Sequence, residues 1–236
     1  GSSNEEVRAS TAARIAPALR IGGYRGRLGS FSPFQEGMTA TLGNEDHTLA
    51  QFWYSPSTLR VLTELCRDRE CVALLSTPSV YFALDSEVRK KAVLFEFDKK
   101  WATADVQFRF FDYQQELCEQ NLDLRGRCDL VIADPPRIQE RVVEKYMQMI
   151  HLLSAPGGQI AFTSAMEHEY YFAMCGLFAR NFVPKATAGW AEAGRFRVYT
   201  NFSHACLTNK NEEDFPAGPD GEHDDYSQDH ASWGYA

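Results

Sequence analysis

Short apolar runs recur through the middle of the chain in a pattern typical of buried strands. Residues 72–75 and 130–133 are unbroken apolar runs, as expected of strands that are covered on both faces of a sheet. Further strands are predicted at residues 92–98, 106–111 and 159–163. Because helical segments separate these strands, the pattern favours an α/β fold with a doubly wound, mainly parallel sheet.

The clearest helix signal starts at Ser55, which can cap a helix that has Pro56 at its first position. Its leucines keep helical spacing to about Cys66. A second periodic segment covers residues 138–153 and ends at the Ala-Pro-Gly-Gly sequence of residues 155–158. We also expect helices at residues 80–88 and 166–180, and a closing pair of strands at residues 182–186 and 195–207.

Two prolines end the predicted strand at residues 130–133. Asp134 follows the apolar run, and Pro135 and Pro136 come next. Proline cannot donate a hydrogen bond to a β-ladder, and Pro135 also keeps Asp134 out of the helical region. Ligands of open α/β sheets bind beyond the carboxyl ends of the strands, so Asp134, Pro135 and Pro136 are candidate residues of a functional site.

Polar residues at the ends of neighbouring strands suit a nucleotide-like ligand. The first strand ends in a turn of small residues without the usual glycines, namely Ser76, Thr77, Pro78 and Ser79. About 20 residues further on, an acidic side chain is expected to hold ribose hydroxyls. Asp98 is the preferred residue and Glu96 the alternative, while Asp112 and Tyr113 are placed to meet an adenine ring.

Aromatic residues are concentrated just before the first helix, in the sequence Gln-Phe-Trp-Tyr of residues 51–54. Phe52 and Trp53 fit a hydrophobic core and a lid over a bound cofactor equally well, and both interpretations stay open.

Length and composition limit the class of protein. A chain of 236 residues with 44% hydrophobic residues predicts one domain with a sizeable core. Its apolar runs are shorter than the roughly 20 residues that cross a bilayer, so we expect no membrane contact. The six cysteines contain no Cys-x-x-Cys pair, which favours reduced thiols in an intracellular protein and argues against a metal site.

The net charge of −8 comes from one end of the chain. Residues 211–236 hold eight acidic residues and no lysine or arginine, which leaves 24 acidic and 24 basic residues elsewhere. A neutral body lacks the basic bias of most nucleic-acid binders and argues mildly against a nucleic-acid substrate. We expect residues 208–236 to be an acidic, disordered tail.

The first 49 residues are predicted to be a flexible arm and linker. Residues 11–28 are rich in arginine and free of acids, as in an organellar transit sequence. A cytoplasmic location is preferred, with a mitochondrion or another organelle as the alternative.

Six motifs occur in the order found in one known family. They are Gln-Phe-Trp-Tyr at residues 51–54, Ser-Thr-Pro-Ser-Val-Tyr at 76–81, Leu-Phe-Glu-Phe-Asp-Lys-Lys at 94–100, Phe-Asp-Tyr at 111–113, Asp-Leu-Val-Ile-Ala-Asp-Pro-Pro at 129–136 and Phe-Arg-Val-Tyr-Thr-Asn-Phe at 196–202. Together they resemble the elongation factor 1-alpha lysine methyltransferase 1 family, formerly labelled as an N6-adenine-specific DNA methyltransferase. The resemblance covers about residues 50–203.

The resemblance implies a Rossmann-like, seven-stranded class I methyltransferase sheet with helices on both faces, within a domain at residues 50–207. It implies S-adenosyl-L-methionine (SAM) as cofactor and methyl transfer to a lysine ε-amine of a protein, with translation elongation factor 1-alpha as the candidate substrate. Asp134 would accept a hydrogen bond from that amine and the Pro135 carbonyl a second. The implied cofactor site comprises Ser76, Thr77, Pro78, Ser79, Glu96, Asp98, Asp112, Tyr113 and Asp134.

The chain departs from the family pattern directly after the prolines. The family has an aromatic residue there, which would pack on the amine, whereas Arg137 would repel a lysine ammonium. In one interpretation Trp53 or Tyr54 replaces the missing aromatic face. In another, Arg137 binds an acidic or phosphate-bearing substrate. In a third, the protein has lost methyl transfer and is a binding or assembly module. Methylation of adenine in a nucleic acid is a further alternative.

Overall fold

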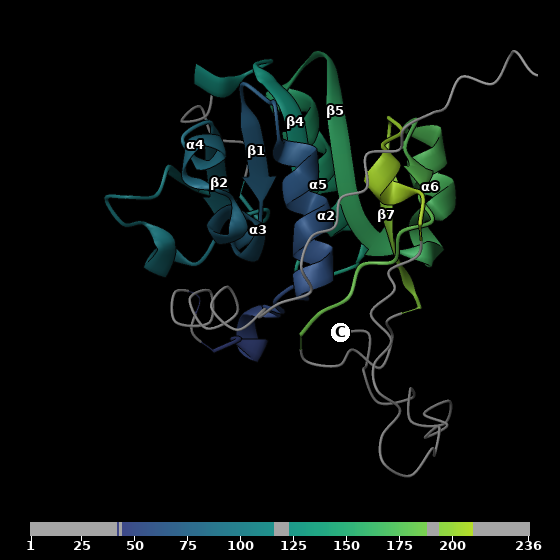
Figure 1. Cartoon of the computed structure of the whole chain (residues 1–236). Coiled ribbons are helices and arrows are strands. Elements are labelled where there is room, and N and C mark those ends of the chain that lie inside the picture. Colours follow the sequence, from purple (N-terminus) through teal and green to yellow (C-terminus); the bar gives the residue numbers. More distant parts are fainter. Residues whose placement is uncertain (1–41, 43, 116–122, 188–193, 210–236) are drawn as a thin grey trace, which may run out of the picture. The chain divides into compact units, whose positions relative to one another are not determined.

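The computed structural model describes residues 42, 44–115, 123–187 and 194–209. These residues form one seven-stranded sheet with the strand order β3-β2-β1-β4-β5-β7-β6 (Figure 1). Strands β1 to β5 are parallel to one another, and β7 is antiparallel to both β5 and β6. The strands are β1 Val72–Leu75, β2 Ala92–Glu96, β3 Phe108–Phe110, β4 Cys128–Ala133, β5 Ser154–Ala165, β6 Phe178–Ala179 and β7 Phe196–Thr200. The predicted seven-stranded, Rossmann-like sheet is confirmed.

Helices cover both faces of the sheet, because successive side chains of each strand point to opposite sides. In β1, Val72 and Leu74 pack with α2 and α3, while Ala73 and Leu75 pack with α5 and α6. In Figure 1, α2 crosses in front of the strands. The helices are η1 His47–Leu49, α2 Pro56–Cys66, α3 Pro78–Ala83, α4 Ser86–Arg89, η2 Lys99–Trp101, α5 Glu140–Leu153, η4 Met166–His168, α6 Glu169–Met174 and η5 Ala205–Leu207.

Helix α2 begins and ends where the sequence predicts. Ser55 Oγ accepts a hydrogen bond from Thr58 N, and Pro56 occupies the first helical position. The leucines of its apolar face are buried in the core. The predicted cap therefore fixes the point at which the aromatic segment before α2 meets the helix.

The predicted closing strands are partly wrong. The helix expected at residues 166–180 ends at Met174, because Gly176 takes a φ of 75° that ends the helix. Strand β6 follows and is only two residues long, too short to show an alternating pattern. Residues 182–186 form no strand of this sheet; Ala186 makes a single bridge with Tyr54.

Other predicted elements exist with different ends. The helix expected at residues 80–88 is two helices, α3 and α4, because Asp85 caps the second one through Glu87 N and Val88 N. The strands expected at 92–98, 106–111 and 195–207 end earlier or start later than predicted, and helix α5 starts at residue 140. Strand β5 begins at Ser154, directly after α5, so the proline and glycines of residues 155–158 lie within it.

Successive strands are first added on one side of β1 and then on its other side. From β1 the chain adds β2 and then β3 on one side, and it returns to place β4 on the other side of β1. Leu75 pairs with Ala133, so both strands end at the same level. The backbone N–H of Asp134 donates to the Leu75 carbonyl at 3.1 Å. Such a switch point is where open α/β sheets bind ligands.

Several expectations fall mainly on residues that the structure does not describe. The predicted arm and tail lie outside the described residues, except for residues 42, 44–49 and 208–209. Cys118 also lies outside them, and the five described cysteines are free thiols. Among the described residues, no helix combines the length and apolar character needed to cross a bilayer. Within the same ranges, no three His, Cys, Asp or Glu side chains are grouped as metal ligands.

We predict that Gly158→Ala destabilises the sheet. A Cβ atom at Gly158 would lie 2.9 Å from the Ala155 carbonyl oxygen and 3.0 Å from that of Cys128. Backbone atoms of the β4–β5 pair cannot move aside freely, so we expect a loss of about 1–3 kcal/mol in urea denaturation. Gly194→Ala is the matched control, because its Cβ atom would meet nothing within 4 Å. Equal unfolding midpoints for the two variants would contradict the prediction.

Candidate functional site

A cavity of about 710 Å³ lies beyond the carboxyl ends of β1, β2 and β4. This volume is within the range of sites that enclose a cofactor or another small ligand. Its walls come from segments that are far apart in the sequence and meet at the switch point of the sheet. The candidate residues from the sequence that line it are Trp53, Tyr54, Ser76, Thr77, Pro78, Ser79, Glu96, Asp112, Tyr113, Asp134, Pro135, Pro136 and Arg137.

The turn after β1 forms one wall with unusual backbone and side-chain features. Ser76 has a φ of 53°, in the left-handed region that residues other than glycine rarely adopt. Its Oγ lies 2.6 Å from the hydroxyl of Tyr146, which comes from α5. Thr77 Oγ1 is buried and has no hydrogen-bond partner among the described residues. A buried hydroxyl without a partner costs about 1–3 kcal/mol, so a polar ligand group would be stabilising here.

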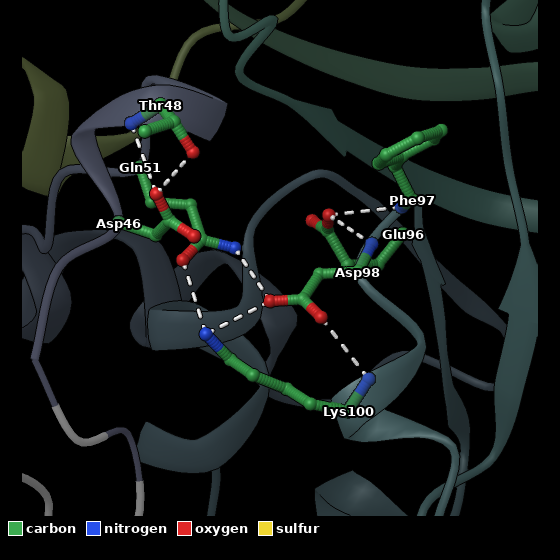
Figure 2. A network of polar contacts seen from close by, with 7 residues as sticks. All are labelled: Asp46, Thr48, Gln51, Glu96, Phe97, Asp98 and Lys100. Atoms are coloured by element: carbon green, nitrogen blue, oxygen red, sulfur yellow. Dashed lines mark hydrogen bonds and ion pairs between the residues drawn. The ribbon is translucent and has the colours of Figure 1, made fainter.

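Glu96, not Asp98, lies at the cavity. Glu96 is 6% exposed, and its Oε1 accepts hydrogen bonds from the backbone N–H groups of Phe97 at 2.9 Å and Asp98 at 3.1 Å (Figure 2). Burial raises the pKa of this carboxyl. Asp98 is absent from the cavity wall, so the structure favours the alternative over the residue preferred from sequence. The expected spacing of about 20 residues from the first turn locates the end of β2. It does not decide which of two acidic residues, two positions apart, faces the cavity.

Asp98 instead joins two segments that are distant in the sequence. Its Oδ2 lies 2.8 Å from Lys100 Nζ and accepts a hydrogen bond from Gln51 Nε2 at 3.1 Å. Lys100 Nζ also donates to Gln51 Oε1 at 3.2 Å, which closes a three-residue network (Figure 2). Gln51 and its neighbour Phe52 line the cavity. The network therefore holds the segment before α2 as a wall of the cavity.

Trp53 packs in the core, as one interpretation predicts, and its role as a lid stays a prediction. The side chain is 8% exposed and packs edge-on against Trp101, with ring centroids 6.2 Å apart. The same residue also lines the cavity. Trp53 thus belongs to the core and to the wall at once.

Asp134 is the acid placed in the Asp-Pro-Pro loop. The residue as a whole is half-buried, and burial of its carboxyl group raises the pKa to about 7, while the nearby Tyr54 hydroxyl lowers the pKa in part. The Tyr54 hydroxyl donates its hydrogen bond to Thr163 Oγ1 at 2.8 Å. A carboxyl with a pKa near neutrality can change its protonation state under physiological conditions.

Arg137 is exposed at the edge of the cavity. Tyr54 lies beside Asp134, and further aromatic side chains in the wall are Phe52 and Phe196. The structure thus supplies aromatic faces to the cavity from several segments. Which of them meets a substrate amine stays a prediction.

Sequence reasoning missed several residues of the cavity and its supports. Phe196 stands in one of the six motifs but was assigned no role, and Tyr146 was one of the apolar positions of the predicted helix at 138–153. Thr163 and Lys185 carry no local signal. Lys185 reaches the cavity because its carbonyl accepts a hydrogen bond from Ser55 N at 2.8 Å, a pairing that only the folded chain shows.

Comparison with known proteins assigns the chain to a family. A family model described as "Probable N6-adenine methyltransferase" matches residues 45–204. EEF1A lysine methyltransferase 1 of Danio rerio is 33% identical over 169 residues, which covers 68% of this chain and 100% of that protein. The chain belongs to the EEF1A lysine methyltransferase 1 family. The protein of the same name from Homo sapiens is 31% identical over 67% of this chain and 75% of its own length.

A relative that matches a smaller part of the chain has a related name. Protein-lysine N-methyltransferase EFM5 of Saccharomyces cerevisiae is 34% identical over 52% of this chain and 52% of its own length. The relatives of the EEF1A lysine methyltransferase 1 family are thus named for lysine methylation, although the description of the family model refers to adenine. The class I methyltransferase fold implied by the six motifs is confirmed.

We predict that Asp98→Ala loosens the segment before α2. The change removes the ion pair with Lys100 and the hydrogen bond from Gln51. These contacts together are worth about 1–2 kcal/mol at a partly exposed site, so amide hydrogen exchange in residues 47–54 should become about tenfold faster. Glu87→Ala is the control, because it removes an exposed ion pair with Lys90 on α4. Unchanged exchange in the Asp98 variant would refute the supporting role.

Proposed function

We propose that this protein is a SAM-dependent methyltransferase that methylates the ε-amine of a lysine in a protein, with translation elongation factor 1-alpha as the candidate substrate. One observation carries the proposal. The Asp134 carboxyl lines a cavity of about 710 Å³ at the switch point of the sheet, in a chain whose relatives are named lysine methyltransferases.

The chemistry of the cavity wall fits SAM. The buried Thr77 hydroxyl has no partner among the described residues and would bind a polar group of the cofactor. Both hydrogen bonds that Glu96 accepts from described residues use Oε1, so Oε2 would accept from ribose hydroxyls. Asp112 and Tyr113 line the part of the cavity after β3 and would meet the adenine ring. Ser76 and Pro78 would let the cofactor approach the backbone closely.

Asp134 would orient the substrate amine. SAM supplies the methyl group on a positively charged sulfur, and its acceptor must be a neutral amine. The ionised Asp134 carboxylate accepts a hydrogen bond from that amine, and the Pro135 carbonyl accepts a second, so that the nitrogen lone pair points into the cavity. Most of the rate would come from this positioning and from the exclusion of water. Since the pKa of Asp134 is about 7, activity should rise with pH through neutrality.

Arg137 favours a second candidate function. Its guanidinium stands where the family has an aromatic residue and would oppose a lysine ammonium by like charge. This favours a methyltransferase-like module that binds a partner without transferring a methyl group. The exposure of Arg137 supports the enzyme instead, because an exposed guanidinium can extend into solvent and leave the amine site.

We predict that Glu96→Gln weakens cofactor binding more than Asp98→Asn does. The first change removes a charge-assisted acceptor inside the cavity, and the second changes a residue outside it. One such hydrogen bond is worth about 1.5–3 kcal/mol, so the Kd for S-adenosylhomocysteine should rise at least about tenfold in Glu96→Gln. Titration calorimetry with SAM and S-adenosylhomocysteine measures it. A larger loss in Asp98→Asn would restore Asp98 as the ribose residue.

We predict that Asp134→Asn lowers methyl transfer to elongation factor 1-alpha by at least about a hundredfold while S-adenosylhomocysteine still binds. The assay follows the mass increase of one methyl group on a lysine. Asp129→Asn is the matched control, because Asp129 lies at the opposite end of β4 and accepts from the N–H groups of Glu70 and Cys71. Cofactor binding without methyl transfer in the unmodified protein would favour the binding module.

A further inference from the structure

Two cysteines lie against each other at the edge of the sheet opposite the cavity. Cys71 directly precedes β1, and Cys128 is the first residue of the neighbouring strand β4. Their sulfur atoms are 3.2 Å apart, and either thiol can donate the hydrogen bond between them. Both are free thiols. The sulfurs would have to approach by only about 1 Å to reach the length of a disulfide bond, which is about 2.0 Å.

The backbone around the two cysteines holds their sulfurs on one face of the sheet. Both side chains pack in the core cluster that α5 covers. Cys71 N donates to Asp129 Oδ1 at 3.0 Å, and the Cys71 carbonyl accepts from Asp129 N at 3.0 Å. Arg127 N donates to the Leu153 carbonyl at 3.0 Å, which ties the start of β4 to the end of α5. The two thiols therefore stay together as long as β1 and β4 are paired.

The two thiols differ in exposure and in acidity. Cys71 is partly exposed, whereas Cys128 is buried. The hydrogen bond from the Cys128 thiol lowers the pKa of Cys71 to about 7, although burial and the charge of Asp129 raise it in part, and Arg127 also favours the thiolate. The same hydrogen bond, together with burial, raises the pKa of Cys128. A reagent in solution thus meets a thiolate at Cys71, with a protonated thiol behind it.

We propose that Cys71 and Cys128 form a redox-sensitive dithiol, in which hydrogen peroxide oxidises the exposed sulfur and the buried sulfur then closes a disulfide between β1 and β4. An accessible, acidic thiol next to a second cysteine is the arrangement typical of redox-sensing sites. Neither cysteine lines the cavity, so the dithiol is a second site, and the inference does not depend on the proposed function.

The oxidation takes two steps and consumes one molecule of hydrogen peroxide. The Cys71 thiolate attacks one peroxide oxygen, the O–O bond breaks, and Cys71 becomes a sulfenic acid, while the departing hydroxide takes up the proton that Cys71 had released. The Cys128 sulfur then attacks the Cys71 sulfur, the S–S bond forms as the S–O bond breaks, and the second hydroxide leaves with the Cys128 proton. The two thiols lose two electrons and two protons, and the peroxide becomes two water molecules.

The link should stabilise the fold. It would close the chain between residues 71 and 128, which restricts the unfolded chain. Because the two sulfurs already lie together, the folded chain needs little adjustment. The oxidised protein should therefore unfold at a higher urea concentration than the reduced protein, and this difference should vanish in Cys71→Ser.

The test treats the purified protein with hydrogen peroxide at neutral pH, blocks the remaining thiols with iodoacetamide and maps the cysteines by peptide mass spectrometry. The expected product is a pair of peptides joined through Cys71 and Cys128 that has lost two hydrogen atoms. Dithiothreitol should restore both thiols by thiol–disulfide exchange.

A variant without the buried thiol separates the two steps. In Cys128→Ala the sulfenic acid at Cys71 should persist, so dimedone should label Cys71 at least about tenfold more than in the unmodified protein. Cys71→Ser serves as the second variant if Cys128→Ala does not fold. In it the link is absent, and the buried Cys128 should remain a thiol.

Cys175→Ser is the matched control. Cys175 is also a partly exposed free thiol that packs against the same core cluster, and its removal should leave the link between Cys71 and Cys128 unchanged. Three results would each overturn the inference. They are oxidation of Cys71 without a link to Cys128, oxidation of Cys175 while both thiols of the pair stay unreacted, and a lower unfolding midpoint in the linked protein.

Discussion

The parallel pairing of β1 with β4 is the constraint on which the site depends. Leu75 and Ala133 are partners, so both strands reach the same edge of the sheet together. The turn at Ser76 and the loop at Asp134 then leave the sheet side by side, and the bond from Asp134 N to the Leu75 carbonyl extends the pairing by one residue. Without this register the turn after β1 and the Asp134 carboxyl would not face one cavity. The buried aliphatic side chains of the two strands therefore position the chemistry as well as stabilising the fold.

The site is assembled from polar groups that are partly or wholly removed from water. Asp134, Glu96, the Tyr54 hydroxyl and Thr77 Oγ1 all lie where burial disfavours a charge or an unpaired donor. Most of them are compensated by backbone or side-chain hydrogen bonds, and Thr77 is not compensated by any described residue. A bound ligand would supply the missing partner. Stability and ligand affinity are thus linked at this edge of the sheet.

The sequence predicts the central strands and α2 well because their signals are local. Unbroken apolar runs identify β1 and β4, and Ser55 with Pro56 marks the start of α2. Strand β6 is not predicted, because a strand of two residues is too short to show an alternating hydrophobic pattern. The sequence prefers Asp98 to Glu96, whereas only Glu96 lines the cavity, because the position of each acid depends on where β2 stops and η2 begins. Thr163 and Lys185 enter the site only through contacts between distant segments, which no local pattern encodes.

The pairing of residues 53–55 with residues 185–187 has a consequence for the order of events on the ribosome. Chains fold from the amino end as they are synthesised, and β1, β2 and β4 all precede residue 140. The aromatic wall, by contrast, needs Thr163 and the bridge to Ala186, which leave the ribosome much later. Until then residues 53–55 lack the partners that hold them in the folded protein. The enclosed pocket is therefore among the last parts of the molecule to appear, and a chain truncated before residue 187 would lack it even with its central strands in place.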